Sequence, residues 1–286
     1  MSTATQLRGI ELQTALVRRA SRLPPISTSV VELTQICVAP DWEIGDACRV
    51  IDSDPLLLGA ILREANSAVF GAASLAETSH DAVVRLGASR VMSISVEMGL
   101  EGLLGNNSPY GLAAVSVFRH SYIASVAAEV VRRFSPRSLP HVLPAAALMH
   151  DVGELVLSHH LSSATLNDLD AARTVGMSVV EAERRVLDID HAEVSAIICR
   201  LWRFPDVIAD GVRHHHAPWT SGDALSYAVA LCDVIADVAL GGSNRDVVDS
   251  LTVSRCLVEL DITKVDFGGL VEHTTERLAK YGKQFV

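Results

Sequence analysis

Positive charge is scarce in this chain. Its 286 residues include 24 lysines and arginines against 34 aspartates and glutamates, which gives a formal net charge of −10. No basic stripe is present, because Arg132-Arg133 and Arg184-Arg185 are isolated pairs in mixed surroundings. Binding to nucleic acid depends on clustered lysine and arginine that neutralise phosphates. We therefore expect no nucleic-acid partner.

Cysteine motifs and long apolar runs are also missing. The five cysteines are odd in number, show no CxxC spacing and lie in apolar surroundings, which is typical of reduced core thiols in a cytosolic protein. The N-terminus has no continuous apolar segment of the signal-peptide kind. The most apolar long stretch, residues 224–240, carries Asp233 and Asp237 and is too short and too charged to span a bilayer. We expect a cytoplasmic protein without membrane insertion.

No stretch alternates apolar and polar residues for long enough to indicate a sheet, so the sequence predicts an all-α fold. Asp54-Pro55 is a helix start, with Asp as N-cap and Pro at the first helical position, and the helix is expected to run to Phe70. A second helix is expected over residues 81–104, with Ser79 as its cap. The glycine, asparagine and proline cluster at residues 105–111 predicts a boundary. We expect an N-terminal helical subdomain over residues 1–105 and a second one over residues 106–286.

Helical periodicity continues in the second half of the chain. One helix is expected over residues 112–134, followed by a loop at residues 136–144 and a continuous apolar helix through His150-Asp151. No helix is predicted over the polar stretch at residues 162–173. Further helices are predicted over residues 179–187, from the cap Asp190 to about Phe204, and from Pro205 to the histidine triplet, with three more after residue 225.

Histidine and aspartate gather in this second half. His120 shares a helix face with Val117, Ile123 and Ala124, so it is expected to point inward. His150-Asp151 lies in an apolar run. A buried imidazole beside a buried carboxylate is unfavourable unless something satisfies both groups. The sequence predicts either a metal ion or a hydrogen-bond network that collects these side chains.

A series of motifs resembles the HDOD domain, a bacterial signal-transduction module related to the HD and HD-GYP phosphohydrolases. In chain order the motifs are Leu23-Pro24-Pro25, Ile51-Asp-Ser-Asp-Pro55, Leu62-Arg-Glu-Ala-Asn-Ser-Ala68, Ala82-Val-Val-Arg-Leu-Gly87, His120-Ser121, Leu148-Met-His-Asp-Val-Gly153, Asp190-His-Ala-Glu193 and the histidine triplet with Ala217-Pro218. The resemblance covers about residues 16–240. It implies an all-helical HDOD fold, with the second subdomain of the HD type, and a regulatory role.

The same resemblance implies a metal site. In the HD-GYP relatives, histidines and aspartates of these motifs hold two or three metal ions. Divalent Fe, Mn, Zn or Ni would suit such ligands. The histidine triplet leaves the register open, since His214-His215 is an alternative pair, and Asp237 is an alternative to the last ligand. Carried over by motif, the candidate ligands are His120, His150, Asp151, His191, His215, His216 and Asp233.

Two departures from the catalytic relatives favour a non-enzymatic function. Glu154 occupies the position at which they carry a phosphate-binding lysine, and no Gly-Tyr-Pro motif follows His216. We expect a signalling module that binds a protein partner, with a nucleotide as a further candidate ligand. The alternative is a metal-dependent phosphohydrolase acting on a cyclic dinucleotide or nucleotide. Trp202 and Trp219 flank the triplet, and for both we favour a core position over a pocket wall.

Overall fold

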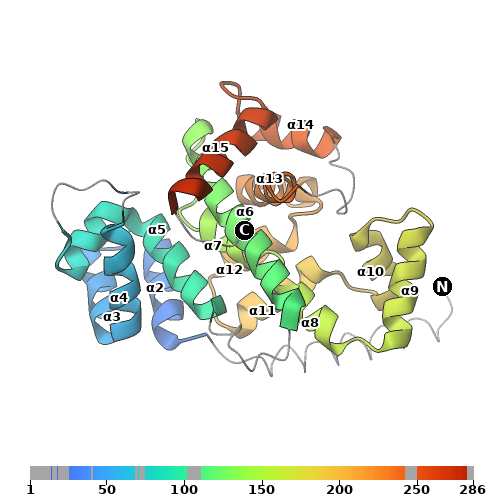
Figure 1. Ribbon diagram of the computed structural model, residues 1–286, viewed down its shortest axis with the longest axis horizontal. Helices are drawn as coiled ribbons and strands as arrows, with labels where there is room; N and C mark the ends of the chain where they lie inside the picture. Colours follow the sequence, from blue (N-terminus) through green and yellow to red (C-terminus); the bar gives the residue numbers. More distant parts are fainter. Residues whose placement is uncertain are drawn as a thin grey trace.

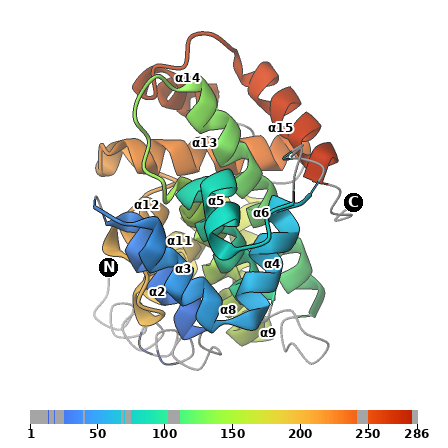
Figure 2. The same cartoon turned by 90° about the vertical axis from the view of Figure 1, so that its left-hand side faces the viewer.

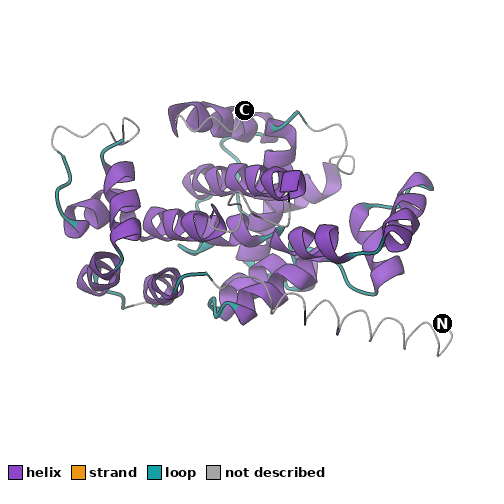
Figure 3. Cartoon of the chain, turned by 60° about the horizontal axis from the view of Figure 1, so that its bottom comes forward, coloured by secondary structure: helices purple, strands orange, loops and turns teal. Residues whose placement is uncertain are grey.

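The computed structural model describes Thr14, Arg18 and residues 26–39, 41–67, 70, 75–101, 111–241 and 250–281. Over these residues the regular elements are helices and no strand is found (Figure 3). The all-α prediction is therefore confirmed. No helix in this part of the chain is long and apolar enough to cross a membrane.

The N-terminal helices α2 (Thr28–Val38), α3 (Ile44–Ser53), α4 (Pro55–Ala65) and α5 (Ser79–Glu101) pack against one another (Figure 2). The predicted cap is confirmed, because the Asp54 carboxylate accepts hydrogen bonds from the backbone N–H groups of Leu56 and Leu57. Helix α4 ends at Ala65, not at Phe70. Asn66 is the C-cap of this helix. Its side-chain NH2 donates to the Ala76 carbonyl and its side-chain oxygen accepts from the Ala76 N–H, and these bonds hold the chain as it turns back toward α5.

Helix α5 differs from the prediction at two points. Thr78, not Ser79, caps it. The Thr78 hydroxyl accepts a hydrogen bond from the Asp81 N–H, and the Asp81 carboxylate accepts hydrogen bonds from the N–H and the hydroxyl of Thr78. The helix is also interrupted at Gly87, whose φ of 73° is a left-handed value that glycine adopts without steric cost. The predicted subdomain boundary at residue 105 lies outside the described residues, and the division into two subdomains stays a prediction.

Helix α6 (Gly111–Phe134) runs through the middle of the molecule and contacts α7 and α13 (Figure 1). The predicted continuous helix through His150-Asp151 is wrong. Two helices, α7 (Leu143–Met149) and α8 (Val152–His160), meet at this pair, and Asp151 leaves the helical region with φ −105° and ψ 7°. The break turns both side chains toward the same interior space.

Helices α9 (Ser163–Thr174) and α10 (Val179–Leu187) form a hairpin that projects from the rest of the molecule (Figure 1). We call residues 163–187 the α9–α10 hairpin. The polar stretch left without a helix is α9, in which Ala172 is the one buried residue. The predicted helix over residues 179–187 is confirmed, with a capping box formed by Ser178 and Glu181.

Helix α11 (His191–Leu201) begins at the predicted cap Asp190, which accepts from the Glu193 N–H, but it ends three residues before Phe204. Helix α12 (Asp206–Arg213) follows Pro205 and stops at the histidine triplet, as predicted. The short 3-10 helix η3 (Pro218–Thr220) leads to α13 (Ala224–Ala239), α14 (Ser250–Glu259) and α15 (Phe267–Tyr281), which confirms three helices after residue 225.

Charged and polar side chains cross the interface between the N-terminal helices and α6. Arg90 of α5 is 5% exposed and its guanidinium lies 2.5 Å from the Glu64 carboxylate and 3.6 Å from that of Glu129 on α6. Glu129 also pairs with Arg277 of α15. These four residues form the charge chain, which joins α4, α5, α6 and α15.

Gly153 sets the approach of α8 to α11. A Cβ at this position would lie 2.2 Å from the His191 carbonyl oxygen and 2.8 Å from the Ser195 backbone nitrogen. The Gly153 N–H donates to the Ser195 hydroxyl at 2.8 Å, so the two backbones are in direct contact. Only glycine fits between these helices without displacing α11.

We expect Gly153→Ala to lower the free energy of unfolding by about 2–3 kcal/mol, because the extra methyl group must push two backbones apart. Gly59→Ala is the matched control. No atom lies within 4 Å of its added Cβ, and the substitution replaces glycine at an exposed position inside helix α4, which stabilises by about 0.5–1 kcal/mol. Urea unfolding of both variants measures the difference. Equal stabilities for the two variants would contradict the close contact.

Candidate metal site

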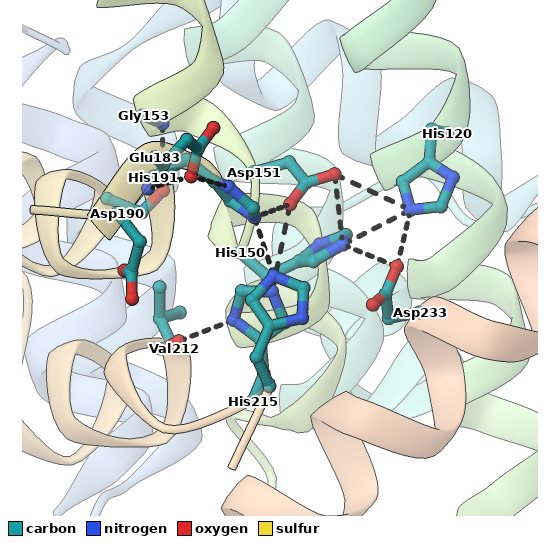
Figure 4. A network of polar contacts seen from close by, with 12 residues as sticks. His120, His150, Asp151, Gly153, Glu183, Asp190, His191, Val212, His215 and Asp233 are labelled. Carbon is teal, nitrogen blue, oxygen red and sulfur yellow. Dashed lines mark hydrogen bonds and ion pairs between the residues drawn. The ribbon is translucent and has the colours of Figure 1, made fainter. Parts of the chain in front are cut away.

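The structure brings all seven candidate ligands together, from five places in the fold. His120 comes from α6, His150 and Asp151 from the α7–α8 break, His191 from the first position of α11, His215 and His216 from the turn after α12, and Asp233 from α13. They form two adjoining groups in which the candidate ligand atoms lie within 4.8 Å of one another. Most of them are labelled in Figure 4. The groups are His120, His150, Asp151 and Asp233, and His191, His215 and His216.

The first group is centred on ring nitrogens and carboxylate oxygens. His120 Nε2 lies 2.9 Å from Asp233 Oδ1 and 3.2 Å from His150 Nε2. His150 Nε2 lies 3.3 Å from the same Asp233 oxygen and 3.4 Å from Asp151 Oδ2. The histidines and Asp151 are buried, whereas the Asp233 side chain is 15% exposed. One edge of this group is therefore reachable from solvent.

The second group is formed by three imidazoles. His191 Nε2 and His216 Nε2 are 2.6 Å apart, and the rings of His215 and His216 are 3.9 Å apart between centroids. Asp151 Oδ1 lies 3.5 Å from His191 Nε2 and 3.8 Å from His215 Nε2. Since the other oxygen of Asp151 faces His120 and His150, this one carboxylate lies between the two groups (Figure 4).

Three of the rings are oriented by hydrogen bonds on their outer side. His150 Nδ1 donates to the Ala147 carbonyl at 2.7 Å, and His215 Nδ1 donates to the Val212 carbonyl at 2.6 Å. A carbonyl oxygen only accepts, so the proton is on Nδ1 and the lone pair of each neutral ring is on Nε2. Outer partners of this kind fix the ring orientation in metal sites.

The third oriented ring is His191, and its partner Glu183 was not predicted. Glu183 of α10 is buried and accepts from both the His191 ring Nδ1, at 2.7 Å, and the His191 backbone N–H, at 2.9 Å. The sequence holds a signal for this role. Val179, Glu183 and Leu187 are spaced by four residues on one helix face, so Glu183 is a charged residue in an otherwise apolar row.

The carboxylates control the protonation of the rings. Burial by itself lowers the pKa of His150, but Asp151 and Asp233 outweigh it and raise that pKa to about 9. Burial is likewise outweighed at His191, where Glu183 and Asp151 raise the pKa to about 10. At His215, burial and the neighbouring His150 lower the pKa to about 4. The carboxylates thus favour the protonated, positively charged forms of His150 and His191.

The donor set fits a metal ion. The neutral His150 ring would direct its Nε2 lone pair at oxygens of Asp151 and Asp233, which are acceptors as well. The buried His215 Nε2 has no hydrogen-bond partner among the described residues and faces Asp151. Converging lone pairs repel unless a cation or a proton lies between them. Imidazole nitrogen with carboxylate oxygen is the ligand chemistry of first-row divalent ions.

The two alternative ligands that the sequence left open, His214 and Asp237, lie in different positions relative to the ligand groups. His214 is outside both groups, and its Nδ1 contacts the Thr220 hydroxyl at 3.1 Å. Asp237 lies one turn beyond Asp233 and is 3.3 Å from His120 Nδ1, on the outer side of that ring. The geometry thus favours His215 and His216 for the pair and Asp233 for the last ligand.

The model of the HDOD domain family matches residues 23–218. The chain belongs to the HDOD family. Its match extends over most of the chain but stops before α13, so Asp233 lies beyond it.

Solved structures share the HDOD fold. An HDOD domain protein of unknown function from Geobacter sulfurreducens is 19% identical, with a TM-score of 0.71 and coverage of 96% of this chain and 98% of that chain. A candidate phosphohydrolase from Shewanella amazonensis is 23% identical, with a TM-score of 0.68 and coverage of 95% and 98%. A candidate signal-transduction protein from Marinobacter aquaeolei is 21% identical, with a TM-score of 0.68 and coverage of 96% and 63%.

An uncharacterized protein of Treponema pallidum is 23% identical over 219 residues, which are 73% of this chain. The aligned part is 42% of that relative's length, so this HDOD chain spans well under half of it.

A cavity of about 490 Å³ opens onto both ligand groups of the HDOD protein. Its walls include Asp151, His191 and Asp233, together with α10 and Thr252 of α14. Trp219 lines it as well, is 42% exposed and stacks under the Arg255 guanidinium at 4.9 Å. The predicted core position is thus wrong for Trp219, whereas Trp202 is buried as expected.

Metal-free protein should lose stability as the pH rises from about 6.5 to about 9. His150 and His191 have folded-state pKa values above the ordinary 6.5, so their protonated forms stabilise the fold below pH 6.5 and this stability is lost as the pH rises toward 9 and 10. The expected slope is on the order of 1 kcal/mol per pH unit. Urea unfolding after chelation measures it.

Glu183→Gln is the companion variant, because it removes the charge that raises the pKa of His191. Its stability should depend less steeply on pH than that of the wild type. A wild-type profile that is flat or rises over the same interval would contradict the charged-histidine description.

Proposed function

We propose that this HDOD protein is a non-catalytic signalling module. In this proposal the His/Asp cluster binds divalent metal, and the α9–α10 hairpin passes the state of the cluster to a protein partner. One observation carries it: the Glu183 carboxylate of α10 holds His191 by two hydrogen bonds. A change at the His191 ring therefore reaches the hairpin through a single side chain.

The proposed metal ligands are the seven residues of the two groups. Metal binding by this His/Asp cluster is supported by the ligand spacing and by the unpartnered Nε2 of His215. Fe, Mn, Zn and Ni all suit the donor set. Bound divalent ions would supply positive charge and Lewis acidity to an oxygen ligand in the cavity. His150, His191 and His215 are already oriented toward this interior by their outer hydrogen bonds.

The α9–α10 hairpin has the properties of a surface that binds a protein partner. It is almost entirely exposed along α9, and Leu166 and Val175 present apolar side chains that are 38% and 75% exposed. A second link ties it to the site, because Arg184 of α10 bonds the buried Asp190 carboxylate at 2.7 Å, directly before His191. Exposed apolar side chains on a projecting element suit a protein partner.

Glu154 supports regulation over turnover. Its carboxylate lines the cavity beside Asp151 and His191, where the related phosphohydrolases carry a lysine. A negative charge next to the ligand groups repels the phosphate of an ester substrate. The likeness to a protein named for signal transduction agrees with this proposal at the level of fold.

The test is hydrogen exchange of α10 with and without Mn²⁺. Metal binding should slow amide exchange over residues 179–187 in the wild type, since an occupied His191 holds Glu183 in place. In Glu183→Ala the protein should still bind Mn²⁺, but exchange in α10 should no longer respond to it.

Glu193→Gln is the control variant. Glu193 is also a carboxylate near His191, but it pairs with Arg213 on α12, so its loss should leave the α10 response unchanged. Two results would contradict the proposal. One is wild-type protein that binds no metal, and the other is an α10 response that persists in Glu183→Ala.

A second candidate function is a metal-dependent phosphohydrolase acting on a cyclic dinucleotide or nucleotide. It is favoured by the cavity, which opens directly onto the candidate ligand atoms and has room for a substrate of this size. We expect no hydrolysis of cyclic dinucleotides by Mn²⁺-loaded protein, assayed by chromatography of the products. Hydrolysis that disappears in His150→Ala would establish this second function and overturn the non-catalytic proposal.

A further inference from the structure

Glu154 belongs to a third ligand group that none of the motifs predicts. It lies in the first turn of α8, three residues after the Asp151 position, and is half-buried. Candidate ligand atoms of Asp151, Glu154 and His191 lie within 4.8 Å of one another. Two members of this group are shared with the groups described above, while Glu154 is new. All three line the cavity.

Carboxylate side chains outnumber guanidinium groups in the walls of the cavity around this group. Five carboxylates line it and, among the described residues, one guanidinium, that of Arg184. Arg184 is itself paired with Asp190, so its charge is partly neutralised. In a partly buried space such an excess of negative charge attracts cations and disfavours anions. The carboxylates are Asp151, Glu154, Glu181, Asp233 and Asp237.

A second observation points to a cation at this place. The buried His215 Nε2, which has no hydrogen-bond partner in the described structure, points at Asp151 Oδ1 from 3.8 Å. His191 Nε2 points at the same oxygen from 3.5 Å. A cation bound at Asp151 would act as the partner that the His215 Nε2 atom lacks.

We propose that Glu154, together with Asp151 and His191, binds an additional divalent cation on the cavity side of the cluster. The ligand set of two carboxylates and one imidazole suits a hard or borderline ion such as Mn²⁺. At this position the protein thus carries a cation ligand in place of the phosphate-binding lysine of the phosphohydrolases. The cavity thereby takes a metal ion itself and not a phosphate ester. This inference rests on the proposed metal binding by the other seven residues.

The experiment is a titration of the metal-free, full-length protein with Mn²⁺, in which the electron paramagnetic resonance signal of free Mn²⁺ gives the number bound and each affinity. Wild-type protein should bind one weaker equivalent that Glu154→Gln and Glu154→Lys lose or bind at least about tenfold less tightly. The tighter equivalents should remain in both variants.

Glu181→Gln is the matched control, because it removes one carboxylate from the same cavity wall but not from the ligand group. It should keep the weaker equivalent. If Glu181→Gln loses that equivalent to the same degree as Glu154→Gln, the effect is one of net charge and the inference is wrong. It is also wrong if Glu154→Gln binds the same number of ions with the same affinities as the wild type, although metal binding as such would then stand. Wild-type protein that binds no Mn²⁺ would overturn both this inference and the proposed function.

Discussion

The second half of the fold depends on one buried carboxylate among imidazoles. Asp151 is 1% exposed, and its two oxygens face His120 and His150 on one side and His191 and His215 on the other. A charge in the protein interior is tolerated only with partners close by. The α7–α8 break, α6, α11 and the turn after α12 must therefore meet at one point. Their packing order follows from that requirement.

The site is rigid on one side and open on the other. Main-chain carbonyls hold His150 and His215, and the backbone contact at Gly153 fixes α8 against the helix that begins with His191. The remaining outer partner, Glu183, comes from a hairpin that has little other contact with the molecule. Of the three oriented rings, one thus depends on a projecting element. The proposed regulatory role would use this difference between the rings.

Local chemistry explains what the sequence could predict. The caps at Asp54 and Asp190 require only a side-chain oxygen and the next helical turn, so they are visible without tertiary information. The candidate ligands followed from the motif order of a related family. In contrast, periodicity does not reveal the breaks at Gly87 and at His150-Asp151, because apolar residues continue on both sides of each break. Helix α9 was missed because a helix that buries one residue has no apolar stripe.

The charge chain has a consequence for where this folding unit ends. The family match stops at residue 218, yet Arg277 of α15 pairs with Glu129, which in turn contacts Arg90 and, through it, Glu64. A fragment cut at the family boundary would leave the Glu129 carboxylate without one of its two cationic neighbours, in an interface where water replaces it poorly. It would also lack Asp233. The packed unit thus extends beyond the residues that match the family model, and it includes helices after residue 218.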